Sequence, residues 1–238
     1  MMKQNAVPLL CATLVLAGCA NGGNSNFSTL FSFTARSDQS IPDLAAGSEG
    51  TLYLGIVDGL IKQGRQSAAL AFLDGYSQNG EDLSPRYWLL RGNALLGLRR
   101  NSEAAAAFAK LQDTSLAAHG WNGLGHIAAD EGNWPVANQD FNRAVNGDPA
   151  NADFLNNLAF ADLHLDKTDN AIAGLQQAHE LDPGSDRILM NLIVALTIKG
   201  DGKSAGIFIS GIKDSARRET MRALAKSAVV ALHSGGKS

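Results

Sequence analysis

Two Gly-Lys-Ser triplets suggest a candidate nucleotide site, because this triplet ends the loop that cradles nucleotide phosphates. The triplets begin at Gly202 and Gly236. The phosphate loop also needs a glycine five residues earlier, where this chain has Thr197 and Ala231. Neither triplet follows an expected strand, so we interpret the first as a turn between helices and the second as a tail.

The histidines make a poor case for a metal site. The chain has His119, His126, His164, His179 and His233. None lies in a His-Glu-x-x-His motif. His126 and Asp130 are one helical turn apart, but two ligands make a weak site, and the alternative is that both simply face solvent in a groove. We also find no Gly-x-Ser-x-Gly, no isolated catalytic cysteine and no pair of buried carboxylates. The sequence therefore predicts no metal, no cofactor and no catalytic residue.

The amino-terminal stretch is typical of a secretory signal. It has Lys3 near its start and an apolar run from Ala6 to Leu16, which is far shorter than the roughly 20 residues that span a bilayer. We expect residues 1–18 to be removed as a signal peptide. This removal takes Lys3 from the basic residues and nothing from the acidic ones, so the mature chain is slightly more acidic. It has no basic stripe of the kind that binds nucleic acid.

The four residues Leu16-Ala-Gly-Cys19 resemble the lipobox of bacterial lipoproteins. The resemblance implies that Cys19 is lipidated and anchors the chain in a membrane through several acyl chains. The alternative is an ordinary signal peptide with an incidental cysteine. Ala20 stands where an aspartate would retain such a lipoprotein in the inner membrane, so the expected location is the periplasmic face of the outer membrane.

Residues 19–48 are rich in Asn, Ser and Gly and predict a flexible linker, which as a coil would let the body move roughly 30 Å from the membrane. Phe27, Leu30, Phe31 and Phe33 interrupt this composition. We favour their packing on the first repeat; the alternative is a segment that becomes ordered against a partner.

The elements that position these residues repeat along the chain. Four residue types recur together at one constant spacing. Trp88, Gly92, Ala104 and Phe108 are followed, each at the same distance, by Trp121, Gly125, Ala137 and Phe141. Another set recurs at a slightly longer spacing. Leu124, Ala137, Ala144 and Pro149 are followed, each at that distance, by Leu158, Ala171, Ala178 and Pro183. A period of about 34 residues is typical of a helix-turn-helix solenoid. A single unit cannot bury its own apolar face, so neighbouring units must stack.

This pattern resembles that of the tetratricopeptide repeat family, which has a Trp, a Leu-Gly pair, an Ala, an aromatic residue and a Pro at these offsets. The resemblance implies an all-α, right-handed superhelical solenoid. We expect five repeats over residues 49–214, a capping helix over 215–233 and a tail over 234–238. The apolar stripe of that last helix, with basic residues elsewhere on it, fits a cap.

In this family the first helix of each repeat lines a groove that binds protein partners. The resemblance implies that the groove here carries Asn93, His119, Asn122, His126, Asn156, Asn157, Phe160, His164, Arg187 and Asn191. Asn157 and Asn191 fall where family members use an amide against a partner's backbone. The alternative is that these amides satisfy the helix ends of the repeats themselves. Arg86 and Arg187 lie in distant repeats, which argues against a clamp for a terminal carboxylate.

Residues 155–196, in which Asn-Asn-Leu opens one repeat and Asn-Leu the next, are similar to the tight-adherence (Flp) pilus assembly lipoproteins of the TadD family. This resemblance implies a non-catalytic, pilotin-like role, with the pilus secretin or another pilus assembly component as the partner. The alternative is a periplasmic adaptor that scaffolds cell-wall hydrolases or synthases.

Overall fold

The computed structural model describes residues 49–78 and 83–235, and within these ranges all regular structure is helical. The helices are α2 (Glu49–Lys62), α3 (Gln66–Gln78), α4 (Pro85–Gly97), α5 (Asn101–Ala109), α6 (Ala117–Asp130), α7 (Trp134–Gly147), α8 (Ala152–His164), α9 (Thr168–Leu181), α10 (Asp186–Ile198), α11 (Gly202–Gly211) and α12 (Ser215–Gly235). The all-α fold class is confirmed. The expected signal peptide, Cys19 and the linker lie outside the described residues.

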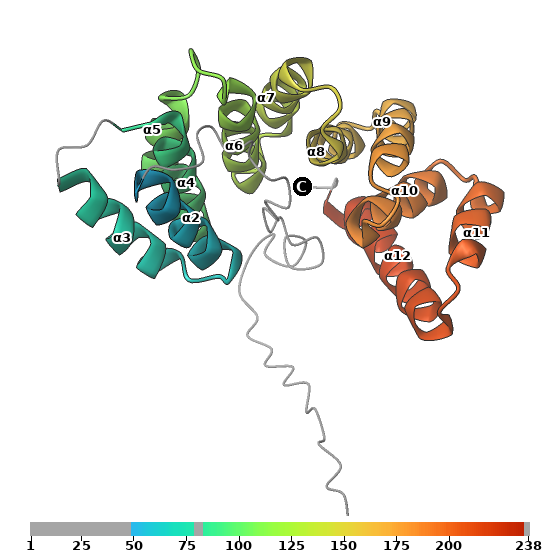
Figure 1. Cartoon of the computed structure of the whole chain (residues 1–238). Coiled ribbons are helices and arrows are strands. Elements are labelled where there is room, and N and C mark those ends of the chain that lie inside the picture. Colours follow the sequence, from blue (N-terminus) through green and yellow to red (C-terminus); the bar gives the residue numbers. More distant parts are fainter. Residues whose placement is uncertain (1–48, 79–82, 236–238) are drawn as a thin grey trace, which may run out of the picture.

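Consecutive helices pack in pairs, and the pairs follow one another along an arc (Figure 1). Helices α4, α6, α8 and α10 lie on the concave side of the arc, and α5, α7, α9 and α11 lie on its outside. Helix α12 packs against α10 and α11 at the carboxyl-terminal end. None of the described helices has the length and apolar character needed to cross a bilayer.

A residue with positive φ follows the first helix of every pair and repeats with the period of the sequence. These residues are Gly64, Arg99, Gly132, Asp166 and Gly200, with φ between 57° and 83°. The left-handed conformation suits glycine and strains other residues. Its recurrence at the same place shows that all five pairs share one turn geometry, although two of them lack the glycine.

Close contact between an aromatic ring and helical glycines joins neighbouring pairs. Phe108 on α5 is fully buried and lies between Gly92 of its own pair and Gly123 of the next. A Cβ atom added at either glycine would lie 2.5 Å from the ring. Phe141 on α7 meets Gly125 on α6 in the same way, where the added Cβ would lie 2.6 Å from the ring. The bulky and small residues of the repeat pattern are therefore direct contacts.

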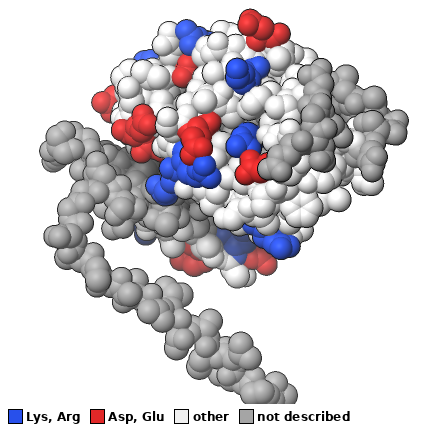
Figure 2. All heavy atoms as spheres, turned by 90° about the vertical axis from the view of Figure 1, so that its left-hand side faces the viewer, with Lys and Arg blue, Asp and Glu red and all other residues white. Residues whose placement is uncertain are grey.

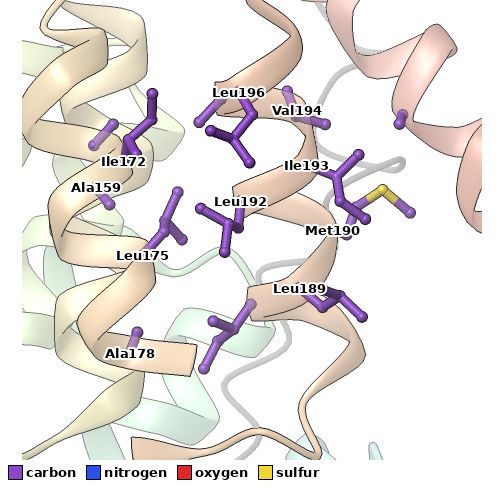
Figure 3. Packing of buried hydrophobic residues seen from close by; sticks show 14 of the residues in the cluster. Ala159, Ile172, Leu175, Ala178, Leu189, Met190, Leu192, Ile193, Val194 and Leu196 are labelled. Atoms are coloured by element: carbon purple, nitrogen blue, oxygen red, sulfur yellow. The ribbon is translucent and has the colours of Figure 1, made fainter. Parts of the chain in front are cut away.

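The apolar core runs along the whole arc rather than forming one centre. In its carboxyl-terminal part, Leu175 and Ala178 on α9 face Leu192 on α10, whereas Met190 and Ile193 point away to the other side of α10 (Figure 3). Met221 and Ala225 on α12 belong to the same cluster. Helix α10 is thus buried on both sides, which fits the capping role predicted for the residues of α12.

Charged residues of both signs are interspersed on the face of the molecule shown in Figure 2, which looks onto the left-hand side of Figure 1. Ion pairs also join neighbouring helices, as Arg91 on α4 does with Asp74 on α3 at 2.6 Å. The described part of this face has no continuous basic area.

We predict that Gly123→Ala lowers the free energy of unfolding by about 1–3 kcal/mol, because the new methyl group overpacks against the Phe108 ring, which is already confined by Gly92. This loss should exceed the gain of about 1 kcal/mol in helix propensity. The control is Gly206→Ala on α11, where nothing lies within 4 Å of an added Cβ and stability should rise. Urea titration compares the two, and a rise in both would refute the ring contact.

Candidate functional site

The first helices α4, α6, α8 and α10 lie along the concave side of the arc and carry equivalent positions, and we call these positions the inner face. The repeat period aligns these positions in rows. The rows are Arg86, His119, Asp153 and Arg187; Leu89, Asn122, Asn156 and Met190; Leu90, Gly123, Asn157 and Asn191; and Asn93, His126, Phe160 and Val194. Most of the predicted groove residues therefore occupy four adjoining rows. Most of these residues are buried, and the row that begins at Arg86 is partly exposed throughout.

Asn157 is the centre of a hydrogen-bond network that connects α6, α8 and α10. Its Nδ2 donates to Asn122 Oδ1 at 2.9 Å and lies 3.2 Å from His126 Nε2. Its Oδ1 accepts from Asn156 Nδ2 at 3.3 Å and from Arg187 Nη1 at 3.1 Å. The amide of Asn157 thus uses both of its donors and both lone pairs within the protein.

The network continues onto α10. Asn191 Nδ2 donates to Asn156 Oδ1 at 2.9 Å, so two amides of successive first helices pair directly. Arg187 also forms an ion pair with Asp153, and both side chains are about a third exposed, at 30% and 31%. The buried Oδ1 of Asn191 has no hydrogen-bond partner among the described residues. The Arg187–Asp153 pair is therefore where the network reaches solvent and can contact a ligand.

The network bears on the two roles considered for the asparagines. Asn156, Asn157 and Asn191 are buried inside α8 and α10, and the contacts described above are with other side chains rather than with helix ends. Helix α8 is capped instead by Asn151, whose Oδ1 accepts from Phe154 N at 3.1 Å. The amide of Asn157 is engaged within the protein, so its predicted pairing with a partner's backbone would require these hydrogen bonds to be exchanged.

His126 is buried beside this network and holds no charge near neutral pH. Burial lowers its pKa to about 3, and the positive charge of Arg187 acts in the same direction. Because the Asn157 amide nitrogen can only donate, the Nε2 atom of His126 accepts, and the ring proton lies on Nδ1. His126 is therefore a fixed acceptor in the network, and its position does not make it a metal ligand with exposed Asp130.

Aromatic contacts add a second feature that the sequence patterns did not predict. His164 stacks on Trp134 with ring centroids 3.5 Å apart, and Phe160 meets both rings edge-on. His119 similarly packs against the edge of Phe154. Burial lowers the pKa of His164 to about 4, so this ring is also neutral. Trp134 lies on an outer helix, and no periodic signal relates it to the groove positions.

The remaining predicted residues lie apart from the network. Asn93 is half-buried on α4, in the row of His126. Arg86, on α4, is separated by α6 and α8 from Arg187 of the network, as expected from their spacing. Among the described residues, no group of three or more His, Cys, Asp or Glu side chains is arranged to hold a metal ion.

The neutral state of His126 predicts a pH dependence of stability. Between pH 6.5 and about 3 the unfolded chain binds a proton at this residue and the folded chain does not, so stability falls as the pH is lowered. From the two pKa values, the loss at pH 5 is about 2 kcal/mol relative to pH 7.5. His126→Gln keeps an acceptor but cannot titrate. This variant should lose about 2 kcal/mol less unfolding free energy between pH 7.5 and pH 5, as measured by urea titration at both pH values. The same loss in the variant and the original protein would contradict a neutral, buried His126.

Comparison with known proteins agrees with the arrangement of the helices. No protein-family model matches the chain. The TPR repeat-containing protein PA4299 of Pseudomonas aeruginosa is 30% identical over 173 residues, which cover 72% of this chain and 68% of that protein.

Solved structures resemble the chain in fold. TTC0263, a TPR protein of Thermus thermophilus, has a TM-score of 0.59 at 19% identity and covers 75% of this chain and 98% of its own. MamA of Desulfovibrio magneticus has a TM-score of 0.54 at 21% identity, covering 77% and 98%. YrrB, described as a TPR protein with an unusual peptide-binding site, has a TM-score of 0.50 at 18% identity, covering 74% and 89%. With its repeats, its helix pairs and the Pseudomonas relative, the chain belongs to the tetratricopeptide repeat (TPR) family.

Proposed function

We propose that this protein is a non-catalytic adaptor that binds a segment of a protein partner on its inner face. The observation that carries the proposal is the polar network centred on Asn157, which reaches solvent at the partly exposed Arg187–Asp153 pair. This ion pair offers one donor and one acceptor group that can pair with the backbone of any peptide. The peptide-binding site named for YrrB supports a ligand of this class.

We further propose that the adaptor is a lipoprotein, held at the periplasmic face of the outer membrane by acyl chains on Cys19. The support is the signal-like sequence of residues 1–18 and the Leu16-Ala-Gly-Cys19 motif. Ala20 favours transport to the outer membrane over retention in the inner one. Lipidation would place a binding surface at the membrane where secretion machines assemble.

The partner that we propose is the secretin of a tight-adherence (Flp) pilus machine, or another component of that machine. The support is the similarity of residues 155–196 to the TadD family of pilus assembly lipoproteins. The inner face would hold a secretin segment while the lipid on Cys19 directs the complex to the outer membrane. An adaptor for cell-wall hydrolases or synthases would use the same surface and anchor, and the identity of the captured partner distinguishes the two.

Anchoring predicts the behaviour of Cys19→Ala. This variant cannot be lipidated at residue 19, so secretin subunits should leave the outer-membrane fraction and form few multimers, as measured by membrane fractionation and immunoblotting in cells that carry the pilus genes. Normal secretin multimers in this variant would contradict the pilotin-like role. A defect confined to cell-wall enzymes would favour the adaptor instead.

Recognition at the inner face predicts a difference between two arginines that each form an ion pair. Arg187→Ala removes the donor to Asn157 and the pair with Asp153, so it should reduce recovery of the partner from envelope extracts at least tenfold. Arg100→Ala, which breaks the pair with Glu103 on outer helix α5, should leave recovery unchanged. Circular dichroism confirms that both variants fold. Equal recovery with both would rule out binding at this part of the inner face.

A further inference from the structure

Each first helix of the solenoid presents four positions to the helix pair that precedes it. On α6 these are Gly120, Gly123, Leu124 and Ile127. An added Cβ at Gly120 or Gly123 would collide with Phe108, and Leu124 and Ile127 pack in the same cluster as that ring. These four positions therefore form the contact between one repeat and the one before it.

The same four positions are covered in the other repeats. On α4 they are Tyr87, Leu90, Arg91 and Ala94; on α8 they are Phe154, Asn157, Leu158 and Ala161; and on α10 they are Ile188, Asn191, Leu192 and Ala195. All of these residues are buried except Arg91 and Leu158, which are half-buried. A covered face at these positions is thus the rule in this solenoid.

On α2 the four equivalent residues are Leu52, Gly55, Ile56 and Gly59, and we call them the α2 face. Leu52 is 71% exposed and Ile56 is 48% exposed. Nothing lies within 4 Å of a Cβ added at either glycine. Helix α2 is the first helix of the arc, so no described helix precedes it (Figure 1). The α2 face therefore has the chemistry of an inter-repeat contact but no described contact.

The other end of the solenoid is different. Helix α12 buries Met221 and Ala225 against the core, and its outer side exposes Arg217, Arg222 and Lys226 together with Leu224 and Val230. Terminal elements of solenoids need a polar outer face, because an apolar one would associate with other molecules. At the carboxyl-terminal end α12 covers the last repeat and carries charged residues on its outer side, whereas no described helix covers the α2 face.

We propose that residues 27–33 of this chain pack on the α2 face, in the place that the second helix of a preceding repeat would occupy. This segment carries Phe27, Phe31 and Phe33, and a phenylalanine is what Gly123 receives in the equivalent contact. Gly55 is the equivalent of Gly123, and it offers the same space for a ring.

The length of chain between the segment and the α2 face permits this contact. The connection from Phe33 to Gly55 is longer than the equivalent connection from Phe108 to Gly123, but it is less than twice as long. The cost of closing a loop grows only with the logarithm of its length, so the difference adds little loop-closure entropy. The reach is also ample, since an extended residue spans about 3.3–3.6 Å and all of α2 is only about 21 Å long.

The contact would shorten the tether between membrane and solenoid, a consequence that rests on the lipidation proposed above. Phe27 lies close to Cys19 in the sequence, whereas Glu49, where α2 begins, lies much further along. At full extension the spans from Cys19 are about 29 Å to Phe27 and about 108 Å to Glu49. A docked segment would thus hold the inner face close to the bilayer, where a partner entering the membrane can reach it.

The first test uses the chain that starts at residue 19 with Cys19→Ser, so that lipidation plays no part in the outcome. If a ring occupies the α2 face, Gly55→Ala should lower the urea midpoint, whereas Gly206→Ala, on a helix surface with nothing within 4 Å, should raise it. When Phe27, Phe31 and Phe33 are all replaced by Ser, Gly55→Ala should instead raise the midpoint. A rise with Gly55→Ala in both backgrounds would overturn the proposal.

The second test uses the fact that this chain with Cys19→Ser has no cysteine left, because the sequence contains only Cys11 and Cys19. Phe31→Cys combined with Leu52→Cys should form an intramolecular disulfide under mild oxidation in at least fivefold higher yield than Phe31→Cys combined with Ile207→Cys. Residue 207 is exposed on α11 and serves as the control. Equal yields would overturn the proposal, and so would a disulfide formed between chains, which would identify a second copy as the occupant.

Discussion

The contact between a bulky side chain of one helix and the small residues of its neighbours controls the geometry of this protein. Phe108 lies between Gly92 and Gly123, and Phe141 lies against Gly125. Without a Cβ at these glycines, the helix backbones approach closely and the ring fills the remaining space. A close-packed interior tolerates few other distances. The Phe108 ring therefore determines how closely α6 approaches the pair before it, and the Phe141 ring how closely α6 and α7 approach each other.

A constant spacing between repeats has a chemical consequence on the inner face. Residues one repeat apart come within hydrogen-bonding distance, as Asn122 does with Asn157 and Asn156 does with Asn191. Buried amides are tolerated only when their donors and acceptors are paired. Pairing between successive first helices meets most of this requirement and ties three repeats together. The same rigidity keeps Arg187 and Asp153 in a defined position at the edge of the network, where a partner can meet them.

The ends of the solenoid lack the neighbouring repeat that covers each repeat face in the middle of the arc. A repeat face is built to be covered, and the stacking that stabilises the middle of the arc leaves one uncovered face at each terminus. Helix α12 covers the last repeat and carries charged residues on its outer side, such as Arg222 and Lys226. Helix α2 retains Leu52 and Ile56 on its outer side. This asymmetry gives the aromatic residues near the amino terminus a physical reason to be close to the solenoid.

The sequence by itself determined the repeat, the helix pairs and many residues of the core, because a period of about 34 residues records which side chains must meet between helices. It also placed the candidate residues on one side of the first helices. Only the tertiary structure decided that Asn157 is the centre of a network, that His126 is buried and neutral, and that Trp134 stacks on His164. The physical reason is that hydrogen bonds, desolvation and ring stacking depend on the positions of atoms from different helices. A pattern of residue types specifies which rows lie side by side, but not which donor meets which acceptor across them.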